Sequence, residues 1–284
     1  MVQTVWLLGG DSRQRALAEL LAADGLRVVC RGLGPGAFSP EGAETADLIL
    51  LPLPVSRSPG LLNAPLSDRE VPLEAVFSAL APGQAVFGGR VDGETVRLAA
   101  EYGLTLRDYF RREEFTIANA VPTAEGAVQL AMEELPVTIR GSRVLVLGFG
   151  RVGKLTAQQF QGLGAAVTVS ARKYEALAWA AALGFTPVLL GKEELSAFDL
   201  VVNTVPAPVL GADRLAQLRP DVLVLDLASP PGGVDWAAVE ELHLRAIHAL
   251  SLPGKVAPVT AAAAIRDAVY HMLTESEQEG SNGT

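Results

Sequence analysis

The architecture of this chain follows from one run of residues: Arg143-Val144-Leu145-Val146-Leu147-Gly148-Phe149-Gly150-Arg151-Val152-Gly153-Lys154. Its apolar first half predicts a buried β-strand and its second half opens a helix, so the glycines stand at a strand-to-helix turn. They match G-x-G-x-x-G: the first glycine permits a tight turn, the second lets the backbone approach a diphosphate, and the third lets helix and strand pack closely. Free amides at the helix N-terminus would face the phosphates. The run therefore predicts a dinucleotide site at Gly148, Phe149, Gly150, Arg151, Val152 and Gly153.

The end of the next predicted strand bears on the choice of dinucleotide. This strand, 166–170, runs into Ser170-Ala171-Arg172-Lys173 and carries no acid at its end. NAD sites usually place Asp or Glu there to accept the ribose 2′-hydroxyl. A hydroxyl and two cations suit a 2′-phosphate instead. We expect Ser170, Arg172 and Lys173 to bind NADP, with NAD as the alternative cofactor and exposed basic residues at a helix start as the structural alternative.

Polar or Pro/Gly-rich loops follow three further strands predicted in this half, at 200–204, 222–227 and 245–249. The carboxyl ends of parallel strands meet at one edge of a sheet, which is where doubly wound folds bind ligands. Each loop alone is also explained as a turn, but together they indicate a nicotinamide pocket. The residues expected to line it are Asn203, Thr204, Val205, Pro206, Asp226, Ala228 and Pro253.

Strands alternate with helices in both halves of the chain, which predicts parallel sheets with right-handed crossovers. The fold class is α/β, with two Rossmann-like, doubly wound parallel-sheet domains joined by a linker helix and with a cleft between them. The expected parts are a flavodoxin- or Rossmann-like substrate domain (1–118), a linker helix (119–136), a dinucleotide-binding domain (137–258), a C-terminal helix packing toward the first domain (259–275) and a flexible tail (276–284).

Charge and composition exclude several classes of partner. Asp and Glu outnumber Lys and Arg by 32 to 23, which gives a formal charge of −9 and argues against nucleic acid or an anionic membrane as partner. Cys30 is the only cysteine, so no internal disulfide can form. The three histidines are scattered without metal-ligand spacing, and we assign no metal. With no signal peptide and no apolar run of about 18 residues, we expect a cytoplasmic protein.

Beyond the glycine turn, five segments resemble the A subunit of dipicolinate synthase from spore-forming bacteria. These segments are 9–14, 51–56, 119–126, 226–233 and 252–258. The resemblance extends over roughly residues 5–275, and these segments are more particular to that family than the glycine motif. Leu53 and Ser251 depart from the pattern without removing a functional group.

The resemblance implies oxidation of a dihydrodipicolinate-type ring to pyridine-2,6-dicarboxylate with NADP as hydride acceptor. It also implies a partner, the flavoprotein-like B subunit of dipicolinate synthase. The implied location is the mother cell of a sporulating bacterium. Self-association into a homo-oligomer stays open.

Such a small dicarboxylate heterocycle needs fixed donors, and the first domain offers them at its strand ends. Arg13 is expected to clamp one carboxylate bidentately, and Ser56 with Arg57 to reach the other. Asn119 and Thr123 stand at the predicted start of the linker helix, whose amide end favours an anion. The structural alternatives are a solvated helix-start residue for Arg13, a turn former for Ser56 and a helix cap for Thr123.

Two alternatives to this function stay open. One is another two-domain NADP-dependent dehydrogenase of the shikimate or amino-acid type, which shares the architecture. Such enzymes usually need a clear acid–base pair, and the first domain contains no lysine. The other is a non-catalytic regulatory subunit that binds a dinucleotide.

Overall fold

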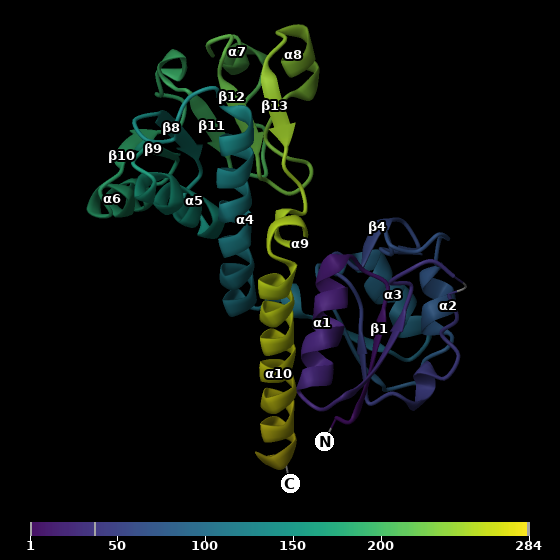
Figure 1. Cartoon of the computed structure of the whole chain (residues 1–284). Coiled ribbons are helices and arrows are strands. Elements are labelled where there is room, and N and C mark those ends of the chain that lie inside the picture. The colour runs from purple at the N-terminus through teal and green to yellow at the C-terminus, as the bar shows by residue number, and fades with distance from the viewer. Residues whose placement is uncertain (1, 37, 283–284) are drawn as a thin grey trace. The chain divides into compact units, whose positions relative to one another are not determined.

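The computed structural model describes residues 2–36 and 38–282, and the chain forms two compact α/β units (Figure 1). Unit 1 comprises Met1–Asn119 and Ala257–Thr284, and unit 2 comprises Ala120–Val256. Both units are Rossmann-like, which confirms the fold class that the sequence predicts. The chain leaves unit 1 after Asn119 and returns to it at Ala257, so the C-terminal helix belongs to the same unit as the N-terminal sheet.

Unit 1 is built on a five-stranded sheet in the order β2-β1-β3-β6-β7, with all neighbours parallel. Its strands are β1 (Thr4–Leu8), β2 (Arg27–Arg31), β3 (Leu48–Leu50), β6 (Ala85–Gly88) and β7 (Thr105–Asp108). Strands β1 and β3 are buried throughout, because apolar side chains cover both faces of the sheet centre. A small antiparallel hairpin, β4 (Ser56–Ser58) and β5 (Leu61–Leu62), follows β3.

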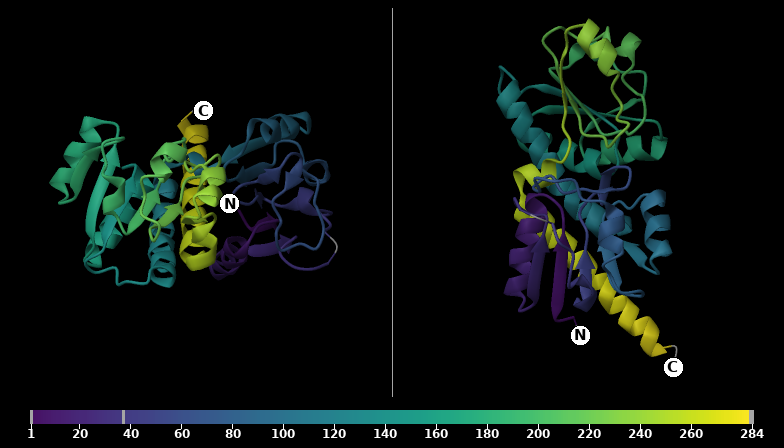
Figure 2. Two further views of the ribbon diagram at one scale, coloured as in Figure 1. Left: turned by 90° about the horizontal axis from the view of Figure 1, so that it is seen from above. Right: turned by 90° about the vertical axis from the view of Figure 1, so that its right-hand side faces the viewer.

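Helices cover both faces of this sheet. They are α1 (Ser12–Ala23), α2 (Leu73–Phe77), α3 (Gly93–Glu101) and α10 (Pro258–Asn282). Leu17 and Leu21 of α1 share one core with Ile265 and Val269 of α10, and the two helices lie side by side (Figures 1 and 2). The second core lies under α2 and α3 and includes Phe77.

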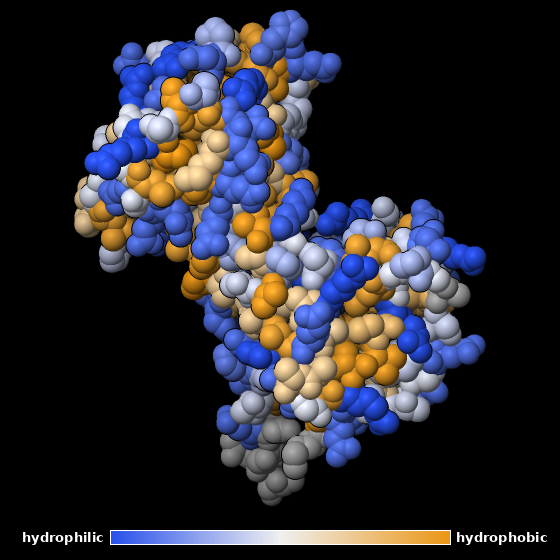
Figure 3. All heavy atoms as spheres, viewed as in Figure 1, coloured by the Kyte–Doolittle hydropathy of each residue, from blue (hydrophilic) through white to orange (hydrophobic). Residues whose placement is uncertain are grey.

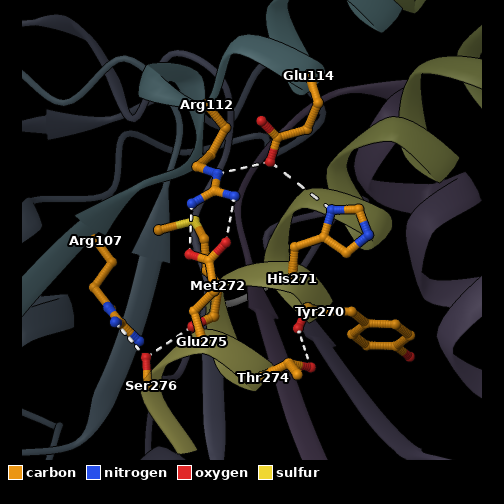
Figure 4. Close-up of polar contacts among 9 residues, drawn as sticks. All are labelled: Arg107, Arg112, Glu114, Tyr270, His271, Met272, Thr274, Glu275 and Ser276. Carbon is orange, nitrogen blue, oxygen red and sulfur yellow. Dashed lines mark hydrogen bonds and ion pairs between the residues drawn. The ribbon is translucent and has the colours of Figure 1, made fainter. Parts of the chain in front are cut away.

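Helix α10 continues through 276–282, where the sequence predicts a flexible tail; residues 283–284 of that tail lie outside the described residues. Side chains near the predicted boundary hold the helix. Arg112 donates to both carboxylate oxygens of Glu275 at 2.6 and 2.7 Å, and its Nε donates to Glu114 (Figure 4). Arg107 donates to the hydroxyl of Ser276. The predicted helix end at residue 275 is therefore wrong, because α10 continues past it and side chains of unit 1 hold the helix at Glu275 and Ser276.

Replacing Arg112 with Ala is expected to speed amide hydrogen exchange in the last turns of α10, since the bidentate contact to Glu275 is lost. The hydrogen bond from Arg112 lowers the pKa of Glu275. The contact is therefore complete above the ordinary carboxyl range and is lost as pH falls through the lowered pKa. The neighbouring Arg111→Ala is the control, because its side chain is 83% exposed and lies 3.9 Å from its partner Asp108. If amide exchange in the last turns of α10 is equally fast in both variants, the contact of Arg112 with Glu275 does not hold the end of the helix.

Unit 2 contains a six-stranded parallel sheet in the order β10-β9-β8-β11-β12-β13. Its strands are β8 (Arg143–Leu147), β9 (Ala166–Ala171), β10 (Thr186–Leu189), β11 (Leu200–Asn203), β12 (Leu223–Asp226) and β13 (Arg245–His248). Its helices are α5 (Arg151–Gly162), α6 (Tyr174–Ala182), α7 (Ala212–Leu215), α8 (Trp236–Glu241) and α9 (Leu252–Val256), with most of α4 (Glu113–Glu134). Two apolar cores lie on opposite faces of the sheet, as a doubly wound fold requires.

Helix α4 corrects the predicted linker. The sequence places its start near Asn119, but the helix begins at Glu113 and contains Pro122 in its interior. Phe115 is 1% exposed and packs edge-on against Tyr109 at 5.3 Å between ring centroids. Burial of this aromatic pair stabilises the early turns and outweighs the preference of proline for a first turn.

No helix within 2–36 and 38–282 combines the length and the apolar character needed to cross a membrane. On the face shown in Figure 3, hydrophilic and apolar atoms are interspersed over both units.

Candidate dinucleotide-binding site

The glycine turn of unit 2 joins β8 to α5. Gly148 has a φ of +94°, a conformation that favours glycine, and its amide donates to the carbonyl of Ser170 at 2.8 Å. Gly150 is the N-cap residue of α5, and a Cβ placed on it would meet no heavy atom within 4 Å. The amide end of α5 is therefore open at the one glycine where a diphosphate must approach the backbone.

The other two glycines are closed in by the protein. A Cβ on Gly153 would lie 2.3 Å from the carbonyl oxygen of Gly148, and one on Gly148 would lie 2.6 Å from Oγ1 of Thr204. Phe149 is 8% exposed and its ring packs edge-on against Phe185, so its side chain belongs to the core. The residues present thus fit a dinucleotide that is bound through backbone amides.

Strand order places this turn where doubly wound folds bind ligands. The order reverses between β8 and β11, whose connections leave on opposite faces of the sheet. Thr204, just after β11, donates its hydroxyl to the carbonyl of Leu147 at 2.8 Å, which ties the two loops together. Val205 is half-buried and Pro206 is exposed beside it. These residues lie at the predicted edge.

Two polar residues predicted to contact the cofactor are instead engaged within the protein. Asn203 and Asp226 are both fully buried, and the amide of Asn203 donates to the Asp226 carboxylate at 2.8 Å. The same carboxylate accepts the backbone amides of Ala228 and Gly233 at 3.1 Å each. Asn203 and Asp226 therefore shape the loops after β11 and β12, and a direct role in binding is not supported. Ala228 and Pro253 are buried in these loop regions.

The three residues at the end of β9 that are predicted to bind a 2′-phosphate differ in their exposure to solvent. Arg172 and Lys173 are exposed, and neither has an ion-pair partner within the described part of the chain. Ser170 is fully buried and donates its hydroxyl to Glu193, so its predicted contact with the cofactor is not supported. Glu193 also accepts from Arg214 at 2.7 Å. The two cations stay available to an anion, while the serine is part of an internal network.

Sequence reasoning did not identify this Glu193–Arg214 pair. The two residues lie 21 positions apart, and the side chain of Glu193 is 1% exposed. Nothing in the local pattern distinguishes it from its neighbour Glu194, which is exposed.

Arg13 of unit 1 does not present a free guanidinium. Its side chain is 6% exposed; Nε and one terminal nitrogen donate to Asp11 at 2.9 and 2.7 Å, and the latter also donates to the carbonyl of Leu53 at 2.6 Å. Burial would raise the pKa of Asp11, but the hydrogen bonds and charge of Arg13, together with the charge of Arg57, lower it. The predicted clamp for a substrate carboxylate is thus occupied by a carboxylate of the protein.

The remaining predicted residues lie in separate surroundings. Ser56, half-buried at the start of β4, donates its hydroxyl to the carbonyl of Ser58 at 2.6 Å. Asn119 and Thr123 lie inside α4, away from the amide end at Glu113. The expected anion site at the start of this helix is therefore wrong for these two residues, and so is the alternative of Thr123 as its cap.

Known proteins match this chain over nearly its whole length. Residues 4–110 match the model of the N-terminal domain of the dipicolinate synthase A subunit, and residues 115–247 match the NAD-binding domain of D-isomer specific 2-hydroxyacid dehydrogenases. The dipicolinate synthase A subunit of Bacillus subtilis (strain 168) is 32% identical over 286 residues, with 96% of each chain covered. The second of the two domain matches supports a nicotinamide dinucleotide as cofactor and an oxidoreductase-type protein.

Two crystal structures of the A subunit of dipicolinate synthase share the fold. The structure from Bacillus halodurans has a TM-score of 0.85 and 31% identity, covering 95% of this chain and 97% of its own. The structure from Bacillus subtilis has a TM-score of 0.85 and 30% identity, covering 98% of both chains. This chain belongs to the family of dipicolinate synthase A subunits.

Proposed function

We propose that the chain oxidises a dihydrodipicolinate-type ring to pyridine-2,6-dicarboxylate, with NADP as hydride acceptor. The observation that carries the proposal is the pairing of a full-length family likeness with an open diphosphate turn and two exposed cations at the end of β9. Action with a B subunit, in the mother cell of a sporulating bacterium, is part of the same proposal and comes from the family.

The reaction removes a hydride and a proton from the ring, and the product is aromatic. Bound NADP would accept the hydride on its nicotinamide ring. Gain of aromaticity drives the step, so the protein mainly has to hold the two rings in reacting geometry. In this chain the backbone amides of the turn at 148–153 would hold the diphosphate, and the loop at 204–206 would border the nicotinamide.

The direct test is the appearance of the ultraviolet absorbance of pyridine-2,6-dicarboxylate when the purified chain receives dihydrodipicolinate and NADP, with and without the B subunit. Formation of product with stoichiometric NADPH supports the proposal. A chain that binds NADP but forms no product under either condition would instead be a regulatory subunit. Oxidation of a different shikimate- or amino-acid-type substrate would point to the other dehydrogenases.

The preference for NADP gives a separate prediction. Changing Arg172→Ser together with Lys173→Ser is expected to weaken NADP binding by on the order of tenfold to a hundredfold, because charge-assisted hydrogen bonds to the 2′-phosphate are lost. NAD binding should change little. Arg140→Ser, an exposed arginine that precedes β8 at the opposite edge of the sheet, is the control. Calorimetric titration with both dinucleotides decides, and equal losses for NADP and NAD would argue against a 2′-phosphate site.

A further inference from the structure

Gln14 is a buried polar side chain whose hydrogen-bonding groups are unused. It stands in the first turn of α1 and is 2% exposed. Its Oε1 and Nε2 are both buried, and neither has a hydrogen-bond partner among the residues that the structure describes. Another glutamine of unit 1, Gln84, is satisfied: it donates to the carbonyls of Ala43 and Ala46 and accepts the amide of Ala81.

The location of Gln14 is the switch point of the unit 1 sheet. The order β2-β1-β3-β6-β7 reverses direction between β1 and β3, and doubly wound folds bind ligands outside the carboxyl ends of the strands at such a point. Gln14 lies on the helix that follows β1. The N-terminal end of that helix also favours an anion.

The turn before α1 is shaped to admit this side chain. Gly10 has a φ of +110°, and a Cβ on it would lie 2.1 Å from Cγ and 3.3 Å from Cδ of Gln14. The glutamine side chain therefore lies over Gly10, in the β1–α1 turn that precedes the amide end of the helix. The next residue toward the N-terminus, Arg13, is already committed to Asp11.

An unpaired buried amide destabilises a fold, whereas methionine would fill nearly the same space without that penalty. A glutamine that the chain itself does not satisfy implies a partner from outside the chain. The carboxamide offers two donor hydrogens and an acceptor side by side. The two donor hydrogens complement a carboxylate oxygen next to the lone pair of a ring nitrogen.

We propose that Gln14 binds the substrate edge made by a ring nitrogen and its adjacent carboxylate. Nε2 donates one hydrogen to the carboxylate and the other to the lone pair of the ring nitrogen. The inference rests on the proposed function and names the residue of unit 1 that recognises the dicarboxylate. The aromatic product carries no proton on its nitrogen at neutral pH, so dipicolinate offers Nε2 the same two acceptors.

The test replaces Gln14 with Met and uses Gln84→Met as the matched control. Calorimetry measures the binding of dipicolinate to the NADP-loaded protein, and thermal unfolding gives Tm. Gln14→Met is expected to weaken dipicolinate binding by about tenfold or more, with NADP affinity unchanged and Tm unchanged or raised. Gln84→Met is expected to lower Tm and to leave dipicolinate binding at the wild-type value. A stabilising change that removes ligand binding separates recognition from a structural role.

Wild-type dipicolinate affinity in Gln14→Met would overturn the inference and leave an interior water as the partner of the amide, with the proposed function intact. If the native chain neither binds dipicolinate nor forms it, the proposed function and the role of Gln14 are both wrong. That result differs from the one in which only Gln14→Met keeps the wild-type affinity. Should Gln14→Met not fold, Gln14→Glu keeps the shape and replaces the donor with an acidic acceptor. It should then lose dipicolinate binding through repulsion, and retained binding would contradict the assignment.

Discussion

Gly150→Ala is expected to abolish dinucleotide binding while unit 2 stays folded. A methyl group at this position meets no heavy atom within 4 Å, and the backbone φ of −81° suits alanine, so the change places no strain on the protein. The same methyl occupies the space through which a diphosphate reaches the amides of α5. Loss of several backbone-to-phosphate hydrogen bonds should weaken NADP binding on the order of a hundredfold. Calorimetric titration and thermal unfolding give the two readouts.

Two further glycines of the same segment serve as controls. Gly153→Ala should lose both stability and binding, because its Cβ would press on the carbonyl of Gly148 at 2.3 Å. Gly162→Ala, at the end of α5, also meets nothing within 4 Å and should be neutral or slightly stabilising, with NADP binding unchanged. If Gly150→Ala binds NADP as tightly as the native chain, the diphosphate does not use this turn and the proposed site is wrong.

The dinucleotide turn was predictable because its determinants are adjacent in the chain. A buried strand such as β8 is an uninterrupted apolar run in the sequence. The positive φ of Gly148 and the close packing of Gly153 against the carbonyl of Gly148 leave few other residues acceptable there. Alternation of such runs with helical patterns was sufficient to predict two parallel sheets. These features are determined by neighbouring residues in the chain, so they can be predicted without knowing which distant residues pack against them.

Polar side chains were assigned less well, because their partners are set by the tertiary fold. Ser170 has the position of a cofactor contact, but Glu193, 23 residues later, accepts its hydroxyl. Asn203 and Asp226 also stand at strand ends, although they bond to each other beneath the loops. A sequence shows that a donor lies at a strand end, but only the packing of neighbouring strands shows whether that donor is still available.

Helix ends show the same limit. Proline and threonine at 122–123 resemble a helix start, yet burial of Phe115 moves the start of α4 to Glu113. At the other end of the chain, polar composition predicts a tail from residue 276, and the contacts of Arg107 and Arg112 with α10 outweigh that composition. Propensity is a weak signal at these positions because a single buried aromatic or bidentate arginine contributes more.

Arg13→Ala is expected to destabilise unit 1 by about 3–5 kcal/mol, the usual result of removing one partner from a buried ion pair. The carboxylate of Asp11 would stay partly buried without a cation, and the carbonyl of Leu53 would lose its donor. A fall in Tm of roughly 10 °C should follow for a unit of this size. Arg15→Ala is the control on the same helix, since Arg15 is exposed and donates only to the carbonyl of Leu33.

The pH dependence of this loss identifies its cause. Asp11 has a lowered pKa in the folded chain, so its pair with Arg13 contributes fully above the ordinary carboxyl pKa and is lost as pH falls through the lowered value. Without Arg13, the burial that raises the pKa of Asp11 is less opposed, so the ionised carboxylate destabilises the variant at neutral pH and its protonation in acid relieves that cost. The stability gap between native chain and variant should therefore be widest near neutrality and close in acid. An Arg13→Ala variant that keeps its Tm but needs more substrate would return Arg13 to the binding site, because its guanidinium would then matter to the ligand rather than to Asp11.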